Sequence, residues 1–177
     1  MKKTVLRYSL LAMIPLFLFL ILPFIYASGQ DLKDMDMSQS ELIGWAGIVL
    51  SQALVILAIK QYRDKEKQGH LGYWQGVKLG TLIALISGLL FGIASFVLYE
   101  YVDPDFTAAY YQQYEDNIRN SGAEPAVIEA QLAQLDATPD WLMTSWMGGI
   151  LMFGNVFPTG FIISLIASGF LYRKPAS

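Results

Sequence analysis

The run Lys78–Tyr99, KLGTLIALISGLLFGIASFVLY, decides the fold of this chain. No residue from Leu79 to Tyr99 is charged, and a helix of this length crosses a bilayer core of about 30 Å. Small residues recur every four positions and fall close to one helical face: Gly80, Ala84, Gly88 and Gly92. This small-residue seam is the pattern that lets membrane helices pack closely. It predicts a helix bundle built around this span.

The composition agrees with a membrane location. Of the 177 residues, 54% are hydrophobic and 15% are charged, whereas soluble domains carry about 25% charged residues. The chain has no cysteine and one histidine, so neither a disulfide framework nor a cysteine-ligated metal site is expected. No basic patch of the kind that binds nucleic acid is present. We expect a single integral membrane domain over residues 1–177, without a catalytic, cofactor-binding or metal-binding residue.

Three other uncharged runs are also long enough to span a bilayer. With the central run they predict an all-α membrane protein with spans at about 8–27, 42–60, 78–99 and 148–172. The last apolar run, 141–172, is longer than the bilayer requires, so part of it must be interfacial, tilted or broken.

The first span has two competing interpretations. A basic start and the small residues at 27–29 fit a cleaved signal peptide. The apolar run is longer than the usual signal core of about 7–15 residues, and three more spans follow it. We therefore favour a retained first helix, and the sequence leaves cleavage open.

An amphipathic helical insert is predicted at 103–137, between the third and fourth spans. Asp103–Asp105 is typical of a helix start, and Ser121-Gly122 of a helix end. Between them, large apolar side chains recur every four residues: Phe106, Tyr110, Tyr114 and Ile118. This stripe is a candidate partner surface.

The charges predict the orientation. The segments 1–7, 60–78 and 173–177 hold ten of the twelve Lys and Arg residues, and the segments 31–41 and 100–140 hold 13 of the 15 acids. Cytoplasmic connections of membrane proteins are enriched in Lys and Arg. Both termini are therefore expected in the cytoplasm, and the insert on the opposite side.

Several polar or helix-bending residues fall within the spans: Gln52, Ser87, Asn155, Pro158 and Thr159. One interpretation is a polar track for an ion or small solute, with a kink at Pro158 that exposes a backbone carbonyl. The other is hydrogen bonding between helices, worth less than about 1–2 kcal/mol per bond. We favour the second, because ion and proton pathways usually include a charged residue and the interior of these spans contains none, Lys60 and Lys78 being at span ends.

The chain also resembles a known bacterial membrane family. The segments that carry the resemblance are Ile59–Lys65, Gly76–Gly80, the acidic insert, and Phe157–Gly160 before a basic C-terminus. They are similar to domain of unknown function family 4199, which is common in Bacteroidota. The resemblance implies four helices and a location in the bacterial inner membrane. It implies no activity, so no catalytic residue is carried over.

The leading functional hypothesis is a non-enzymatic structural or accessory membrane protein that works by packing against another membrane protein or a second copy of itself. The alternative is a small oligomeric transporter or channel with a polar track near Gln52 and Asn155. The sequence does not name the partner, the solute or the oligomeric state.

Overall fold

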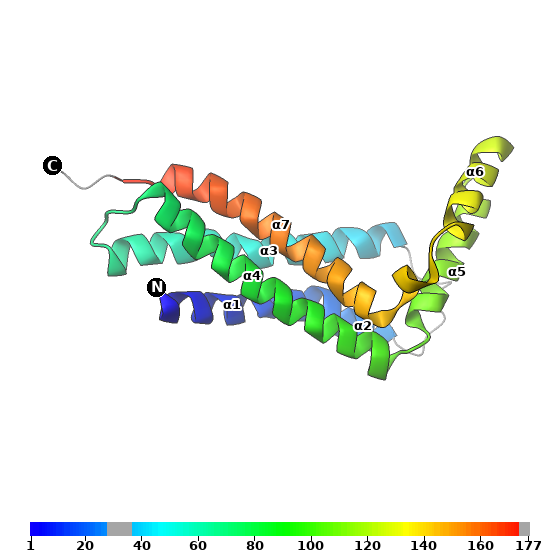
Figure 1. Ribbon diagram of the computed structural model, residues 1–177, viewed down its shortest axis with the longest axis horizontal. Coiled ribbons are helices and arrows are strands. Elements are labelled where there is room, and N and C mark those ends of the chain that lie inside the picture. The colour runs from blue at the N-terminus through cyan, green and yellow to red at the C-terminus, as the bar shows by residue number, and fades with distance from the viewer. Residues whose placement is uncertain (28–36, 174–177) are drawn as a thin grey trace.

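Figure 1 shows an elongated helical bundle with a helical hairpin at one end. This computed structural model describes residues 1–27 and 37–173, and within these ranges the chain forms helices and no β-strand. The elements are α1 (Lys2–Leu16), a π-helix (Phe17–Ile21), α2 (Leu22–Ala27), α3 (Met37–Gln61), a π-helix (Tyr62–Glu66), α4 (Tyr73–Val97), a π-helix (Leu98–Val102), α5 (Phe106–Arg119), α6 (Pro125–Asp136), a 3₁₀ turn (Asp140–Met143) and α7 (Ser145–Leu171).

Four helical stretches in the described part of the chain are long and apolar enough to cross a membrane, as the sequence predicts. They are Lys2–Ile25, Glu41–Glu66, Tyr73–Val102 and Ser145–Leu171. The first three helices extend beyond their uncharged runs by up to about two turns. The last apolar run is longer than a bilayer requires, and its first residues form the 3₁₀ turn. Helix α7 therefore begins only at Ser145.

Proline lies inside two of the long helices, and the backbone differs around the two positions. Pro15 lies within α1, and the π-helical turn Phe17–Ile21 follows it directly. A proline removes one backbone donor, and π-turns are a recognised cause of irregularity in long helices. In contrast, α7 continues as one α-helix on both sides of Pro158.

Met1, Arg173 and the α3–α4 connection lie together at one end of the bundle, which we call the termini end. The α-ammonium of Met1 lies 2.5 Å from Glu66 Oε2, and Leu71 and Arg173 exchange two backbone hydrogen bonds of 3.0 Å. Arg63 Nε donates to Asp64 Oδ1 at 2.7 Å in the same region. Most of the acidic connector at 31–41, and Lys174, lie outside the described residues.

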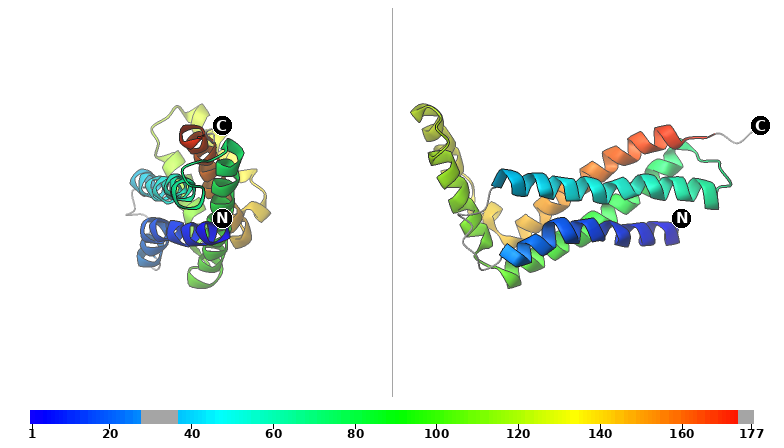
Figure 2. Two further views of the ribbon diagram at one scale, coloured as in Figure 1. Left: turned by 90° about the vertical axis from the view of Figure 1, so that its left-hand side faces the viewer. Right: turned by 180° about the vertical axis from the view of Figure 1, so that it is seen from behind.

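The hairpin α5–α6 lies at the opposite end, which we call the hairpin end. Figure 1 and the right panel of Figure 2, in which the long axis is horizontal, both show the hairpin directed steeply away from the bundle axis. Gly122, between α5 and α6, has a φ of +70°, a conformation that glycine adopts without strain. The predicted stop at Ser121-Gly122 is therefore the turn of this hairpin.

Candidate functional site

The small-residue seam of α4 lies inside the bundle, on the face that packs against α7. Gly80, Ala84, Gly88 and Gly92 are all buried. A Cβ built on Gly92 would lie 2.7 Å from the carbonyl oxygen of Gly149, and one built on Gly149 would lie 2.7 Å from the carbonyl oxygen of Gly92. These contacts are closer than real Cβ contacts, so both positions need glycine. The seam thus joins two helices of one chain.

Helix α7 carries its own small-residue ladder, which the sequence analysis missed. A Cβ on Gly76 would lie 2.6 Å from Ser168 Oγ, one on Gly80 would lie 2.3 Å from Ser164 Oγ, and one on Gly160 would lie 2.5 Å from Ala84 Cβ. Gly160, Ser164 and Ser168 follow one another at four-residue spacing. That spacing is the same signal that identified the seam of α4, and it could have located this face.

Polar side chains meet in the interior where four helices come together. We call the hydrogen-bonded set Ser51, Gln52 and Ser87 the polar cluster, and all three residues have no exposed area. Gln52 Nε2 donates to Ser51 Oγ at 3.2 Å and to Ser87 Oγ at 3.4 Å. The Ser51 hydroxyl donates to the carbonyl of Ala12 at 2.7 Å. These bonds connect α3 to α4 and to α1.

The carboxamide oxygen of Gln52 lies directly against the backbone of α7. It accepts no conventional hydrogen bond, and a Cβ on Gly160 would lie 2.2 Å from it. This position places the oxygen over the Cα–H of Gly160, a weak donor often used between packed helices. The contact leaves the oxygen enclosed by protein atoms.

The other predicted intramembrane residues do not join the polar cluster through a bond that the structure records. Thr159 Oγ1 donates to the carbonyl of Asn155, one turn earlier in α7, at 2.8 Å. Pro158 is exposed on the outside of α7, and Asn155 is half-buried. Of the five predicted residues, Gln52 and Ser87 are hydrogen-bonded to each other. Asn155, Pro158 and Thr159 all lie on α7, and the structure records no bond between them and the polar cluster.

Aromatic rings attach the hairpin to the bundle. Phe24 of α2, Tyr99 and Phe106 form an aromatic cluster, with ring centroids 4.6 Å apart for Phe24–Phe106, 5.5 Å for Phe24–Tyr99 and 5.4 Å for Tyr99–Phe106. The Tyr99 and Phe106 rings are parallel to within 1°. Such pairs contribute about 0.5–1.5 kcal/mol each beyond their buried area. Phe106 therefore holds the start of α5 in place.

The predicted stripe on α5 is divided between inward and outward positions. Phe106 belongs to the aromatic cluster, and Ile118 is buried. Tyr110 and Tyr114 are 38% and 47% exposed. Burial, and then the charge of Glu41, raise the pKa of the Tyr110 phenol. The surface open to a partner is thus the middle of α5, and not the whole stripe.

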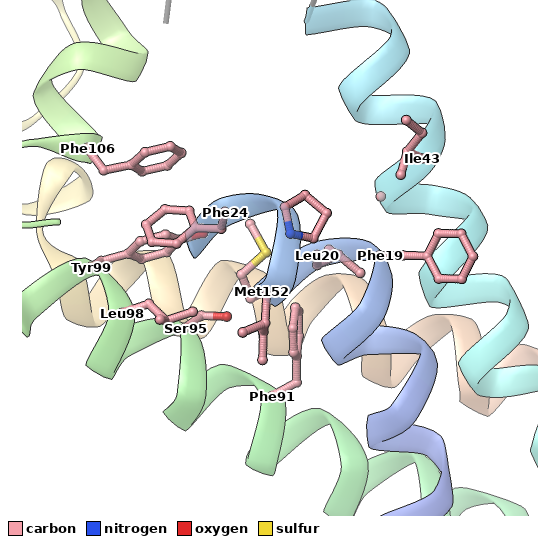
Figure 3. A pocket seen from close by; sticks show the side chains of 13 residues that line it. Phe19, Leu20, Phe24, Ile43, Phe91, Ser95, Leu98, Tyr99, Phe106 and Met152 are labelled. Carbon is pink, nitrogen blue, oxygen red and sulfur yellow. The ribbon is translucent and has the colours of Figure 1, made fainter. Parts of the chain in front are cut away.

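A pocket of about 260 Å³ lies beneath the aromatic cluster, as Figure 3 shows. Its walls come from the π-helical turn and α2, the start of α3, the end of α4 and α7. Phe91 and Ile21 form the deep wall, being 1% and 8% exposed. Ile43, which also lines the pocket, is 49% exposed. The pocket therefore reaches the surface of the bundle at Ile43 on α3.

Acidic and histidine side chains do not gather into a metal site in the described ranges. No group of three or more His, Asp or Glu residues there is arranged to hold an ion. At the hairpin, Glu115 forms an ion pair with Arg119, which raises the pKa of the Arg119 guanidinium through a hydrogen bond. The acids near the start of α5 are N-terminal to a helix, where negative charge is favourable.

Comparison with known proteins gives one match. The family model described as "Protein of unknown function (DUF4199)" matches residues 7–173, which is nearly the whole chain. No curated protein and no solved structure shows significant similarity to the chain. The match covers the first long helix from Arg7 onward, the other three long helices and the hairpin.

Proposed function

This chain belongs to the DUF4199 family of proteins of unknown function, and we propose that it serves in the membrane as a non-enzymatic accessory protein. In this proposal the bundle is a fixed anchor, and the α5–α6 hairpin binds a partner membrane protein.

The observation that carries the proposal is the division of the α5 stripe. Tyr110 and Tyr114 stay exposed on a helix whose first residue, Phe106, is held by ring contacts to Phe24 and Tyr99. Exposed tyrosines on a fixed element bind with little loss of side-chain freedom, and they are enriched at protein interfaces. The seam of α4, in contrast, is already occupied by α7.

We propose that the termini end faces the cytoplasm of a bacterial inner membrane and that the hairpin end faces away from it. Ten of the chain's twelve basic residues belong to the segments at the termini end, in agreement with the positive-inside rule. On this orientation the partner is met outside the cytoplasm.

A transporter or channel is the alternative, and it has less support. Gln52 and Ser87, two residues of the expected polar track, have no exposed area and are hydrogen-bonded to each other. Interhelical bonds of this kind account for both residues without a solute.

Site-specific photocrosslinking tests the proposal. A photoreactive amino acid replaces Tyr114 in the full-length protein, and the matched control carries it at Trp74, which is 74% exposed but near the termini end. We expect position 114 to crosslink one discrete polypeptide in living cells, and the Tyr110→Ala variant to reduce that adduct at least fivefold. Equal adducts at 114 and 74, or none at 114 alongside a correctly folded monomer, would contradict the proposal.

A further inference from the structure

We propose that the pocket beneath the aromatic cluster binds one acyl chain of a phospholipid whose headgroup carries an amine. The proposal concerns the bundle itself and does not rest on the proposed partner contact of the hairpin.

The pocket exists because α1 loses its regular form near the hairpin end. In the π-helical turn, Phe19 and Leu20 are directed at α3, where a Cβ on Gly47 would lie 2.6 Å from Phe19 Cβ and 2.9 Å from Leu20 Cδ1. Gly47 thus permits the turn to contact α3 directly. Above this contact, Gly44 is less crowded, because its Cβ would meet only Leu20 Cδ2 at 3.8 Å. The space left there is the pocket.

The pocket walls are largely apolar, and they favour a hydrocarbon occupant. Apart from the hydroxyls of Ser95 and Tyr99, the side chains that line the pocket are apolar. A buried water needs two to four polar partners, and apolar cavities of about 150 Å³ stay dry and bind small hydrocarbons. This pocket is larger, at about 260 Å³, and its walls include parts of all four stretches that are long enough to span a membrane. In a membrane, the molecules that surround these stretches are the acyl chains of lipids.

The shape favours a chain over a helix from a partner. An α-helix with its side chains is about 10–12 Å across, whereas the pocket, at about 260 Å³, is too small to enclose one. Figure 3 shows the side chains that line it. The aromatic cluster lines the end nearest the hairpin, so an occupant enters beside the exposed Ile43 on α3.

Acidic residues close in sequence to the pocket lining indicate the headgroup. Glu41 lies on α3 two residues before Ile43, and its charge contributes to raising the pKa of the Tyr110 phenol. Glu100 follows Tyr99 directly, and Asp103 lies three residues before Phe106. Carboxylates attract an ammonium group and repel a headgroup with net negative charge. A phosphatidylethanolamine matches this site better than a phosphatidylglycerol with the same chains.

The test uses the full-length protein in mild detergent with equal amounts of phosphatidylethanolamine and phosphatidylglycerol of identical acyl chains. Native mass spectrometry counts the lipid retained by the wild type and by two pocket-filling variants, Gly44→Leu and Ser95→Leu. The matched control is Gly154→Leu, since Gly154 has no atom within 4 Å of its added Cβ and lies outside the pocket. Thermal unfolding shows which variants fold.

We expect one retained phosphatidylethanolamine in the wild type and in Gly154→Leu, at least threefold over phosphatidylglycerol, and a fivefold or greater loss in a folded pocket variant. Retention unchanged by filling the pocket would overturn the site, and equal retention of the two lipids would overturn the headgroup assignment. If neither pocket variant folds, the wild type is instead photocrosslinked with a phosphatidylethanolamine that carries a diazirine on its acyl chain. Crosslinks within Phe19–Phe24 and Phe91–Tyr99 support the site, and crosslinks spread over the outer surface overturn it.

Discussion

Gly92 of α4 and Gly149 of α7 face each other so closely that a Cβ on either one would lie 2.7 Å from the carbonyl oxygen of the other. This mutual contact brings two backbones together where a larger residue would separate the helices. It explains why the seam of α4 is unavailable to another protein.

Replacing Gly92 should therefore destabilise the bundle. We expect Gly92→Ala to lower the free energy of unfolding by about 1–3 kcal/mol, the usual effect of overpacking a well-packed contact. Gly154→Ala is the matched control, because its Cβ meets no atom within 4 Å. Reversible unfolding in mixed micelles measures both, and equal stabilities for the two variants would show that α4 and α7 do not meet at this point.

Gln52→Leu tests whether the polar cluster is a connection or a pathway. The variant loses the bonds from Nε2 to Ser51 and Ser87. Hydrogen bonds between membrane helices contribute about 0.6 kcal/mol on average and about 1.7 kcal/mol at most, so we expect a loss of stability in that range. Unfolding of the purified variant gives the value. A normal stability together with the loss of a solute flux in proteoliposomes would instead favour the transporter.

Phe106→Ala should release the start of α5 from the bundle. The change removes the ring contacts to Phe24 and Tyr99, and we expect faster hydrogen exchange throughout 106–119 while the exchange of α4 is unchanged. Tyr114→Ala is the control, since Tyr114 is 47% exposed and lies outside the aromatic cluster. Protection in α5 that survives Phe106→Ala would mean that α6 alone positions the hairpin.

Glu66→Gln should have only a local effect. The Glu66 carboxylate accepts from the Met1 ammonium and from the Thr4 hydroxyl, but the ion pair is about two-fifths exposed. Exposed ion pairs contribute about 0–1 kcal/mol. We expect faster hydrogen exchange at residues 1–6 with global stability unchanged within that amount. A large global loss would show that this contact fixes α1 against α3.

The four long helices could be predicted from the sequence because their signal is local. Each is an uncharged run whose length alone meets the requirement of a bilayer. The start and stop of α5 were also local, at Asp105 and Gly122. Helix α7 remains α-helical on both sides of Pro158, since a proline in a membrane helix can be accommodated when its neighbours satisfy the freed carbonyl.

The pairing of helices could not be predicted in the same way. The seam on α4 predicted that another helix packs closely against it. Only the three-dimensional structure identifies that helix as α7, which contributes the ladder of Gly160, Ser164 and Ser168. The pocket was beyond sequence reasoning, because it depends on a π-helical turn that displaces Phe19 and Leu20. That turn has no local sequence signature apart from the nearby prolines.

The central claim is a four-span protein with both ends on one side and the α5–α6 hairpin on the other. Because the chain has no cysteine, the claim can be tested with two single-cysteine variants, Tyr114→Cys in the hairpin and Lys67→Cys in the α3–α4 connection. The measurement is labelling by a membrane-impermeant maleimide before and after the inner membrane is permeabilised. We predict that position 114 is labelled before permeabilisation and position 67 only after it. Labelling of both positions before permeabilisation, or of position 67 alone, would contradict the account.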